Sequence, residues 1–98
     1  MFDFKKCRDW VIQESGRLKA ADFRVTVVEA DTPLRVIRIR LEGDKATGEI
    51  VVWENGKTSV MLYHLRSQKF IIEEHDKVLD GGDYETLRDF FGRAIKYR

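Results

Sequence analysis

The fold is decided by residues 46–62, which read ATGEIVVWENGKTSVML. Two runs rich in β-branched and aromatic residues flank Asn55-Gly56, a dipeptide typical of two-residue hairpin turns because both residues tolerate positive φ. If these two residues form the turn, Ile50 lies opposite Met61 in the neighbouring strand. The segment therefore predicts an antiparallel β-hairpin and indicates which side chains share a face.

The flanking sequence extends this hairpin into a larger sheet. Apolar and polar residues alternate over residues 23–27, 37–42 and 69–75, which is the period of a half-buried strand. Turn residues separate these runs, Gly43-Asp44 and Ser67-Gln68 among them. We therefore expect five strands, paired in chain order as an antiparallel meander.

Two amphipathic helices are expected at the ends of the chain. Over residues 2–20 the apolar residues recur at helical steps, and Asp3 is a candidate N-cap. The apolar positions of residues 84–95 follow the same period, with Asp80 or Asp83 as the cap. The predicted fold class is α+β, a five-stranded antiparallel meander sheet with both helices packed on one face.

Length and charge bound the classes of function. A chain of 98 residues suits one domain, expected to span residues 1–98. The net charge of +1 is too small for strong nonspecific binding of nucleic acid. The chain opens without an export signal and has no apolar run of the length that spans a membrane, so we expect a cytoplasmic protein without a membrane partner.

The assumed turns divide the strand residues between two faces of the sheet. The expected core face is uniformly apolar and carries Ile37, Ile39, Leu41, Ile50, Val52, Met61, Tyr63, Leu65, Phe70 and Ile72. The opposite face places Trp53 among aliphatic residues with charged residues around them, a composition typical of protein-binding surfaces. The alternative is that the loop of the first strand or a second copy of the chain covers this face.

Charge is also concentrated locally, in residues 73–85, where six acidic residues accompany a single lysine. Such a segment can steer association with a basic protein, or it can simply cap the second helix and remain solvated. Together with the face around Trp53, it provides the predicted partner-binding residues. These are Arg38, Arg40, Val51, Trp53, Val60, Leu62, His64, Ile71, Asp76, Asp80 and Glu85.

Candidate chemistry is sparse, so we expect no catalytic residue, cofactor or metal. His64 has no ordered serine or cysteine with an acid beside it, and the acids around His75 alternate between the faces of a strand. Cys7 lies on the apolar stripe of the first helix, which predicts a buried, inert thiol. Arg38 and Arg40 near Trp53 would suit stacking on single-stranded nucleic acid, but Glu49 opposes that reading.

The segment GEIVVWENG at 48–56, followed by FIIEEH at 70–75, resembles the TriTu family of bacterial immunity proteins. Those proteins show a similar ITVWESG hairpin and YEH strand within a helix, strands, helix order. Here Asn55 stands in place of the serine and Glu73 in place of the tyrosine.

The resemblance implies an antidote rather than an enzyme. Its partner would be the ADP-ribosyltransferase toxin domain of an Rhs-type effector delivered by type VI secretion. Such toxins modify elongation factor Tu, and covering their NAD site would protect the producing cell. The free protein is expected to be a monomer or a weak homodimer. The alternative functions are a small nucleic-acid-binding or regulatory module and an effector chaperone.

Overall fold

The computed structural model describes residues 2–31, 33–79 and 84–98. Along the chain the elements are α1 (Phe4–Ala20), β1 (Arg24–Ala30), β2 (Val36–Glu42), β3 (Ala46–Trp53), β4 (Lys57–His64), β5 (Lys69–Val78), α2 (Glu85–Ala94) and the 3-10 helix η1 (Ile95–Tyr97). The five strands form one sheet in the order β1-β2-β3-β4-β5, and every neighbouring pair is antiparallel.

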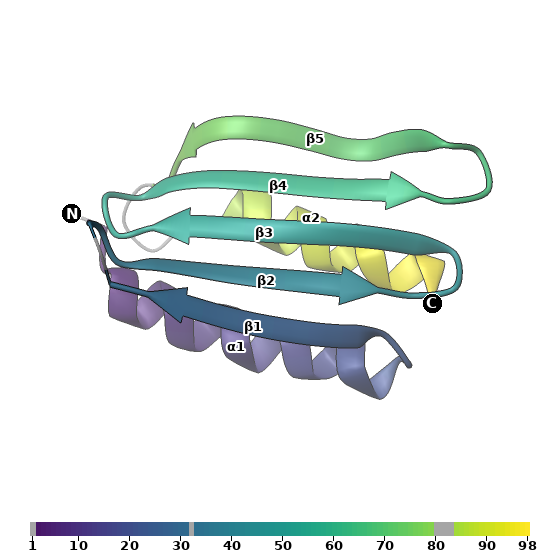
Figure 1. The fold of residues 1–98 in the computed structure, drawn as a ribbon, viewed down its shortest axis with the longest axis horizontal. Helices are drawn as coiled ribbons and strands as arrows, with labels where there is room; N and C mark the ends of the chain where they lie inside the picture. Colours follow the sequence, from purple (N-terminus) through teal and green to yellow (C-terminus); the bar gives the residue numbers. More distant parts are fainter. Residues whose placement is uncertain (1, 32, 80–83) are drawn as a thin grey trace.

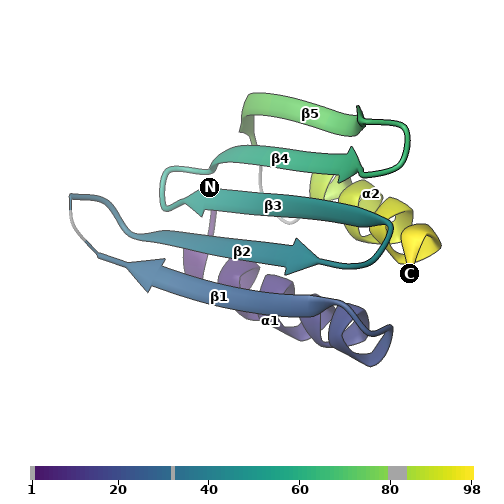
Figure 2. The same cartoon turned by 45° about the vertical axis from the view of Figure 1, so that its right-hand side comes forward.

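Both helices lie on the same face of this sheet, as Figures 1 and 2 show from two directions. Helix α1 runs behind β1, and α2 runs behind β3 and β4 on the same face. The expected α+β meander with both helices on one face is confirmed. We call the sheet face away from the helices the open face.

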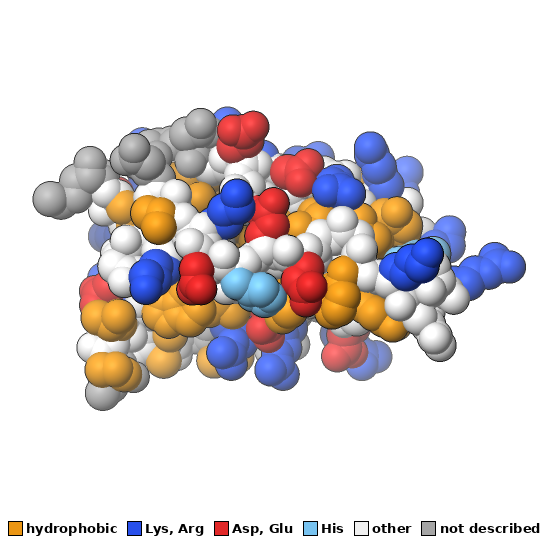
Figure 3. Space-filling view, turned by 90° about the horizontal axis from the view of Figure 1, so that it is seen from above, with side chains coloured by type: hydrophobic (Ala, Val, Ile, Leu, Met, Phe, Trp, Pro, Cys, Tyr) orange, Lys and Arg blue, Asp and Glu red, His pale blue; other side chains and the backbone are white. Residues whose placement is uncertain are grey.

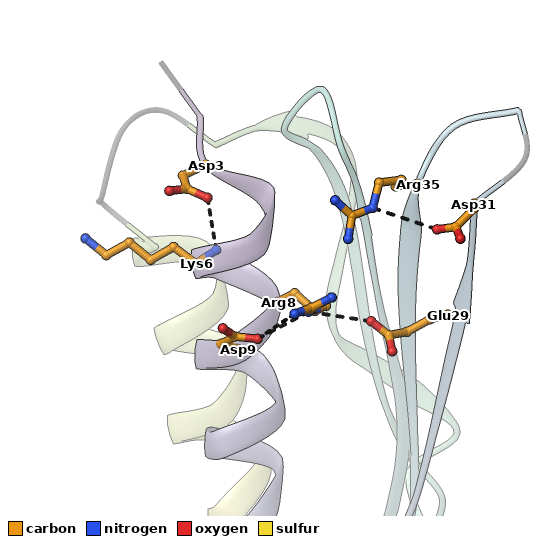
Figure 4. Close-up of polar contacts among 7 residues, drawn as sticks. All are labelled: Asp3, Lys6, Arg8, Asp9, Glu29, Asp31 and Arg35. Atoms are coloured by element: carbon orange, nitrogen blue, oxygen red, sulfur yellow. Dashed lines mark hydrogen bonds and ion pairs between the residues drawn. The ribbon is translucent and has the colours of Figure 1, made fainter.

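Helix α1 begins where the sequence predicts. The Asp3 carboxylate accepts a hydrogen bond from the backbone N–H of Lys6 at 3.1 Å, which satisfies one of the free donors of the first turn (Figure 4). The buried stripe contains Phe4, Cys7, Val11, Ser15 and Leu18. The helix is followed by Asp22, whose φ of 70° turns the chain toward β1.

Helix α2 packs beside α1 through aromatic rings. Trp10 of α1 lies 5.2 Å from Tyr84 and 5.8 Å from Phe91, measured between ring centroids. Phe90 is fully buried, and Gly48 is the reason that α2 can approach the sheet there. A Cβ on Gly48 would lie 3.1 Å from the Phe90 ring and 2.7 Å from the backbone oxygen of Met61. The predicted caps of α2, Asp80 and Asp83, lie outside the described residues.

The β3–β4 turn differs from the prediction by one residue. Ile50 pairs with Val60 rather than with Met61. Gly56 has a φ of 90° and its N–H donates to the Trp53 carbonyl at 2.9 Å. The Asn55 side chain accepts from the backbone N–H of the residue after this glycine, at 3.0 Å. Three residues therefore connect the strands, in a turn with one left-handed residue instead of two.

This extra residue inverts the faces of β4. Thr58, Val60 and Leu62 are fully buried on the helix side of the sheet, whereas Met61 and Tyr63 lie on the open face. The expectation that Met61, Tyr63, Leu65 and Phe70 belong to the core is wrong, and so is the placement of Val60 and Leu62 on the exposed face.

The β2–β3 turn shows why not every register error matters. It is centred on Asp44 and Lys45, one position later than predicted, and the pairing shifts by two residues, so that Ile39 faces Ile50. A shift of two residues preserves the faces, because the side-chain period of a strand is two. The predicted core positions on β2 and β3 are therefore all fully buried.

Candidate functional site

The open face carries a shallow groove over the middle of the sheet. Its volume is about 430 Å³, and its lining comprises Arg40, Glu42, Thr47, Gly48, Glu49, Met61, Tyr63 and Phe70. The apolar side comes from β4 and β5, where the Tyr63 and Phe70 rings meet edge to face at 5.1 Å between centroids. Phe70 is 50% exposed, which leaves a large aromatic surface accessible to a partner.

The charged side of the groove comes from β2 and β3. Arg40 Nε lies 2.7 Å from Glu49 Oε2, and Arg38 Nε lies 3.8 Å from the same oxygen. One carboxylate thus faces two guanidinium groups, so the pair of arginines retains uncompensated positive charge. These ion pairs are largely solvent-exposed and contribute little to folding, about 0 to 1 kcal/mol each.

Four of the predicted site residues lie on the open face as expected: Arg38, Arg40, Val51 and Trp53. Val51 is only 5% exposed, because it sits in the interior of the sheet between Arg38 and Ser59. Trp53 is half-buried at the end of β3 opposite Val36, so part of its indole remains accessible.

Three of the other predicted residues, Val60, Leu62 and His64, do not lie on this face. Val60 and Leu62 belong to the core. His64 lies at the helix side, with Nδ1 2.7 Å from the Ser67 hydroxyl and its ring 5.1 Å from that of Tyr97. Ile71 packs against the core.

The acidic segment is partly described. Asp76 is exposed with a φ of 58°, Glu85 is exposed in the first turn of α2, and Asp80 lies outside the described residues. Along β5, acidic side chains flank a histidine on both sides, and lysines lie nearer the two ends of the strand (Figure 3). Glu73 and His75 share a side there, 3.8 Å apart. The exposed edge is therefore mixed in charge rather than uniformly acidic.

Sequence reasoning missed the apolar half of the groove, namely Met61, Tyr63 and Phe70. The signal was present in Glu54-Asn55-Gly56, which also fits a three-residue turn ending in a left-handed glycine. With that turn, Met61 and Tyr63 of β4 fall on the side of Trp53.

The described residues offer little to support chemistry. Cys7 is fully buried, and burial raises the pKa of its thiol to about 12, which suppresses the nucleophilic thiolate. No cluster of three or more metal-ligand side chains occurs within residues 2–31, 33–79 and 84–98. Neither described helix has the length and hydrophobicity needed to cross a bilayer.

Comparison with known families agrees with the helix, sheet, helix order. The family model for the immunity protein TriTu matches residues 5–92, which covers both helices and all five strands apart from the chain ends. Among the curated proteins and the solved structures, no match to the chain was found. The matched range spans nearly the whole chain, and the chain therefore belongs to the TriTu family of immunity proteins.

Proposed function

We propose that this chain neutralises the ADP-ribosyltransferase domain of an Rhs-type toxin that is delivered by type VI secretion and modifies elongation factor Tu. The observation that carries the proposal is membership of the TriTu immunity family over residues 5–92. An immunity protein implies a toxin as its partner. The class of toxin is proposed from the resemblance of the β3–β4 hairpin and the β5 segment to those of the family. The antidote would act in the cytoplasm, where elongation factor Tu works.

The proposed mode of action is stoichiometric binding that covers the NAD site of the toxin. The open face supports this mode, because it combines exposed aromatic surface at Phe70 with positive charge at Arg38 and Arg40. Apolar surface surrounded by charged groups is typical of protein interfaces. A binding role also suits the buried Cys7 thiol and a face without an ordered catalytic triad among the described residues.

The nucleic-acid alternative is disfavoured by a specific contact. Glu49 Oε2 lies 2.7 Å from Arg40 Nε and 3.8 Å from Arg38 Nε, and its negative charge would repel a phosphate that approaches these arginines. We therefore argue for a protein partner.

The test uses a toxin ADP-ribosyltransferase domain of the class proposed above as the partner. NAD-dependent labelling of elongation factor Tu is measured while the chain is titrated into a fixed concentration of toxin domain. Labelling should fall linearly and stop near equimolar chain, because occlusion consumes one antidote per toxin. A catalytic antidote would act at far lower concentration.

Two further outcomes contradict the proposal. Binding of the toxin domain without loss of labelling would indicate an effector chaperone. Binding of oligonucleotides, with an affinity that falls steeply with salt, would indicate the nucleic-acid module.

A further inference from the structure

We infer that the outer edge of β1 pairs with an extended segment of the toxin, which adds a sixth strand to the sheet. The inference rests on the proposed function, because it assigns a surface of this chain to that partner. It concerns the edge of the sheet rather than the open face.

The two edges of the sheet differ in their readiness to pair. All seven residues of β1 pair with β2 in one continuous register, and Val25, Val27 and Val28 lie among them. The other edge, β5, has two register shifts against β4 and the positive φ of Asp76. Charged side chains follow the β5 edge (Figure 3). Bulges and charges protect edge strands from pairing, so β5 is protected and β1 is regular and largely apolar.

Helix α1 provides an apolar support beside β1. Arg8 Nε lies 3.6 Å from Glu29 Oε1, which aligns this turn of the helix with the end of β1 (Figure 4). The helix and the strand run in opposite directions (Figure 1). Four helical residues rise about 6 Å and two strand residues about 6.6 Å, so Ile12 lies beside Val27.

These two side chains are accessible although both belong to the helix side of the sheet. Ile12 is 40% exposed and Val27 is 37% exposed. A sixth strand beside β1 would lie over Ile12 and cover both residues. The helix-side residues of that strand should therefore be apolar.

On the open-face side of the same edge, the added strand would meet charged residues. The charged open-face residues of β1, β2 and β3 are Arg24, Arg38, Arg40, Glu42 and Glu49, three cations against two anions. The added strand would lie beside Arg24, with the other two arginines one strand further in. Acidic residues on its open-face side would balance this charge. The expected segment thus carries apolar residues on its helix side and, on its open-face side, an acidic residue beside Arg24 and an apolar residue beside the half-exposed Val28.

A second copy of this chain fits the edge poorly. Antiparallel pairing of two β1 strands in one continuous sheet would place both α1 helices on the same face. Neighbouring strands are about 4.8 Å apart, whereas packed helix axes need about 8 to 10 Å. Helix α1 lies behind β1 and extends beyond it in both views (Figures 1 and 2), so the two helices would collide. A toxin segment without a helix at that position avoids the collision.

Hydrogen exchange of the complex with the toxin domain tests the pairing directly. The outward-pointing amides of β1, every second residue, should exchange about tenfold slower or more in the complex, because they gain strand hydrogen bonds. The amides of β5 serve as the internal control and should keep their rates. If the toxin domain binds and the β1 amides keep their rates, the inference is overturned and the proposed function stands. If the toxin domain does not bind at all, both fail.

A pair of matched variants adds an independent readout. Val27→Lys should weaken toxin binding about tenfold or more, since the partner strand would bury the new charge. Val78→Lys places the same change on the β5 edge, where Val78 is 68% exposed, and should leave the affinity unchanged. Equal affinities of the two variants, with unchanged melting temperatures, would overturn the inference. Slow β1 exchange in the free chain that depends on its concentration would identify a homodimer instead.

Discussion

The two faces of the sheet are formed by the same strands but differ in how far their side chains are buried. On the helix side, the central positions of β2, β3 and β4 are fully buried and apolar apart from Thr58. On the open face, Val51 is buried while Phe70 is exposed, and Arg38 and Arg40 lie between them and the β1 edge. The comparison teaches that the helix side is constrained by packing, whereas the open face retains apolar surface that the fold does not use.

The largest expected effect is on the helix side. Leu62→Ala should lower the free energy of unfolding by about 2 to 5 kcal/mol, because it leaves a cavity under α2 at a fully buried position. Chemical denaturation measures this loss. Met61→Ala, the neighbouring position on the open face, is the matched control and should cost clearly less. Equal losses would show that the two side chains do not face opposite sides.

The next effect sharpens the comparison on the open face. Trp53→Ala should weaken toxin binding by about 2 kcal/mol or more, roughly 30-fold, because interface tryptophans contribute strongly when a partner covers them. Its stability loss should be smaller than that of the core variant, since Trp53 is half-buried at a strand end. Calorimetric binding and thermal unfolding of the same protein measure both quantities.

Trp10→Ala is the control for this experiment. Trp10 is also half-buried, but its ring contacts Tyr84 and Phe91 between the helices. It should lower the melting temperature and leave the affinity of the folded protein unchanged. A Trp53 variant that behaves like this control would assign Trp53 to the fold and remove the open face from the interface.

The smallest effect concerns the acidic segment. Asp76→Asn combined with Glu85→Gln should slow association with the toxin severalfold at low salt and little at high salt, because exposed charges steer encounter and are screened by ions. Stopped-flow association at two salt concentrations measures this. Asp9→Asn combined with Asp44→Asn removes the same charge at exposed positions outside the groove and controls for net charge. An unchanged association rate would show that the segment does not steer association and acts only at the start of α2.

Much of the fold follows from local patterns. The helical period, the Asp3 cap and the buried position of Cys7 depend on residues close in sequence, and the structure has all three. The faces of β2 and β3 were also predictable, because Ile37, Ile39 and Leu41 alternate with charged residues that cannot be buried without partners. The candidate site was half predictable for the same reason, through Arg38 and Arg40.

The faces of β4 were not predictable from the pattern. Val60 and Leu62 at one phase and Met61 and Tyr63 at the other are both apolar, so the period does not choose between them. The choice depends on a backbone detail, that Gly56 alone adopts positive φ while the Asn55 side chain accepts a hydrogen bond. It also depends on the side chains of α2, which pack against this part of the sheet.

By itself the sequence determined the order of helices and strands, the antiparallel meander and the faces of the strands in which charge and apolarity alternate, since each follows from local periodicity. Only the tertiary structure decided which of the two alternating sets of β4 side chains joins the core. Phe90 and Leu87 of α2 provide the surface against which Val60 and Leu62 pack, far away in the sequence. The same choice sent Met61 and Tyr63 to the open face, and it created the groove there.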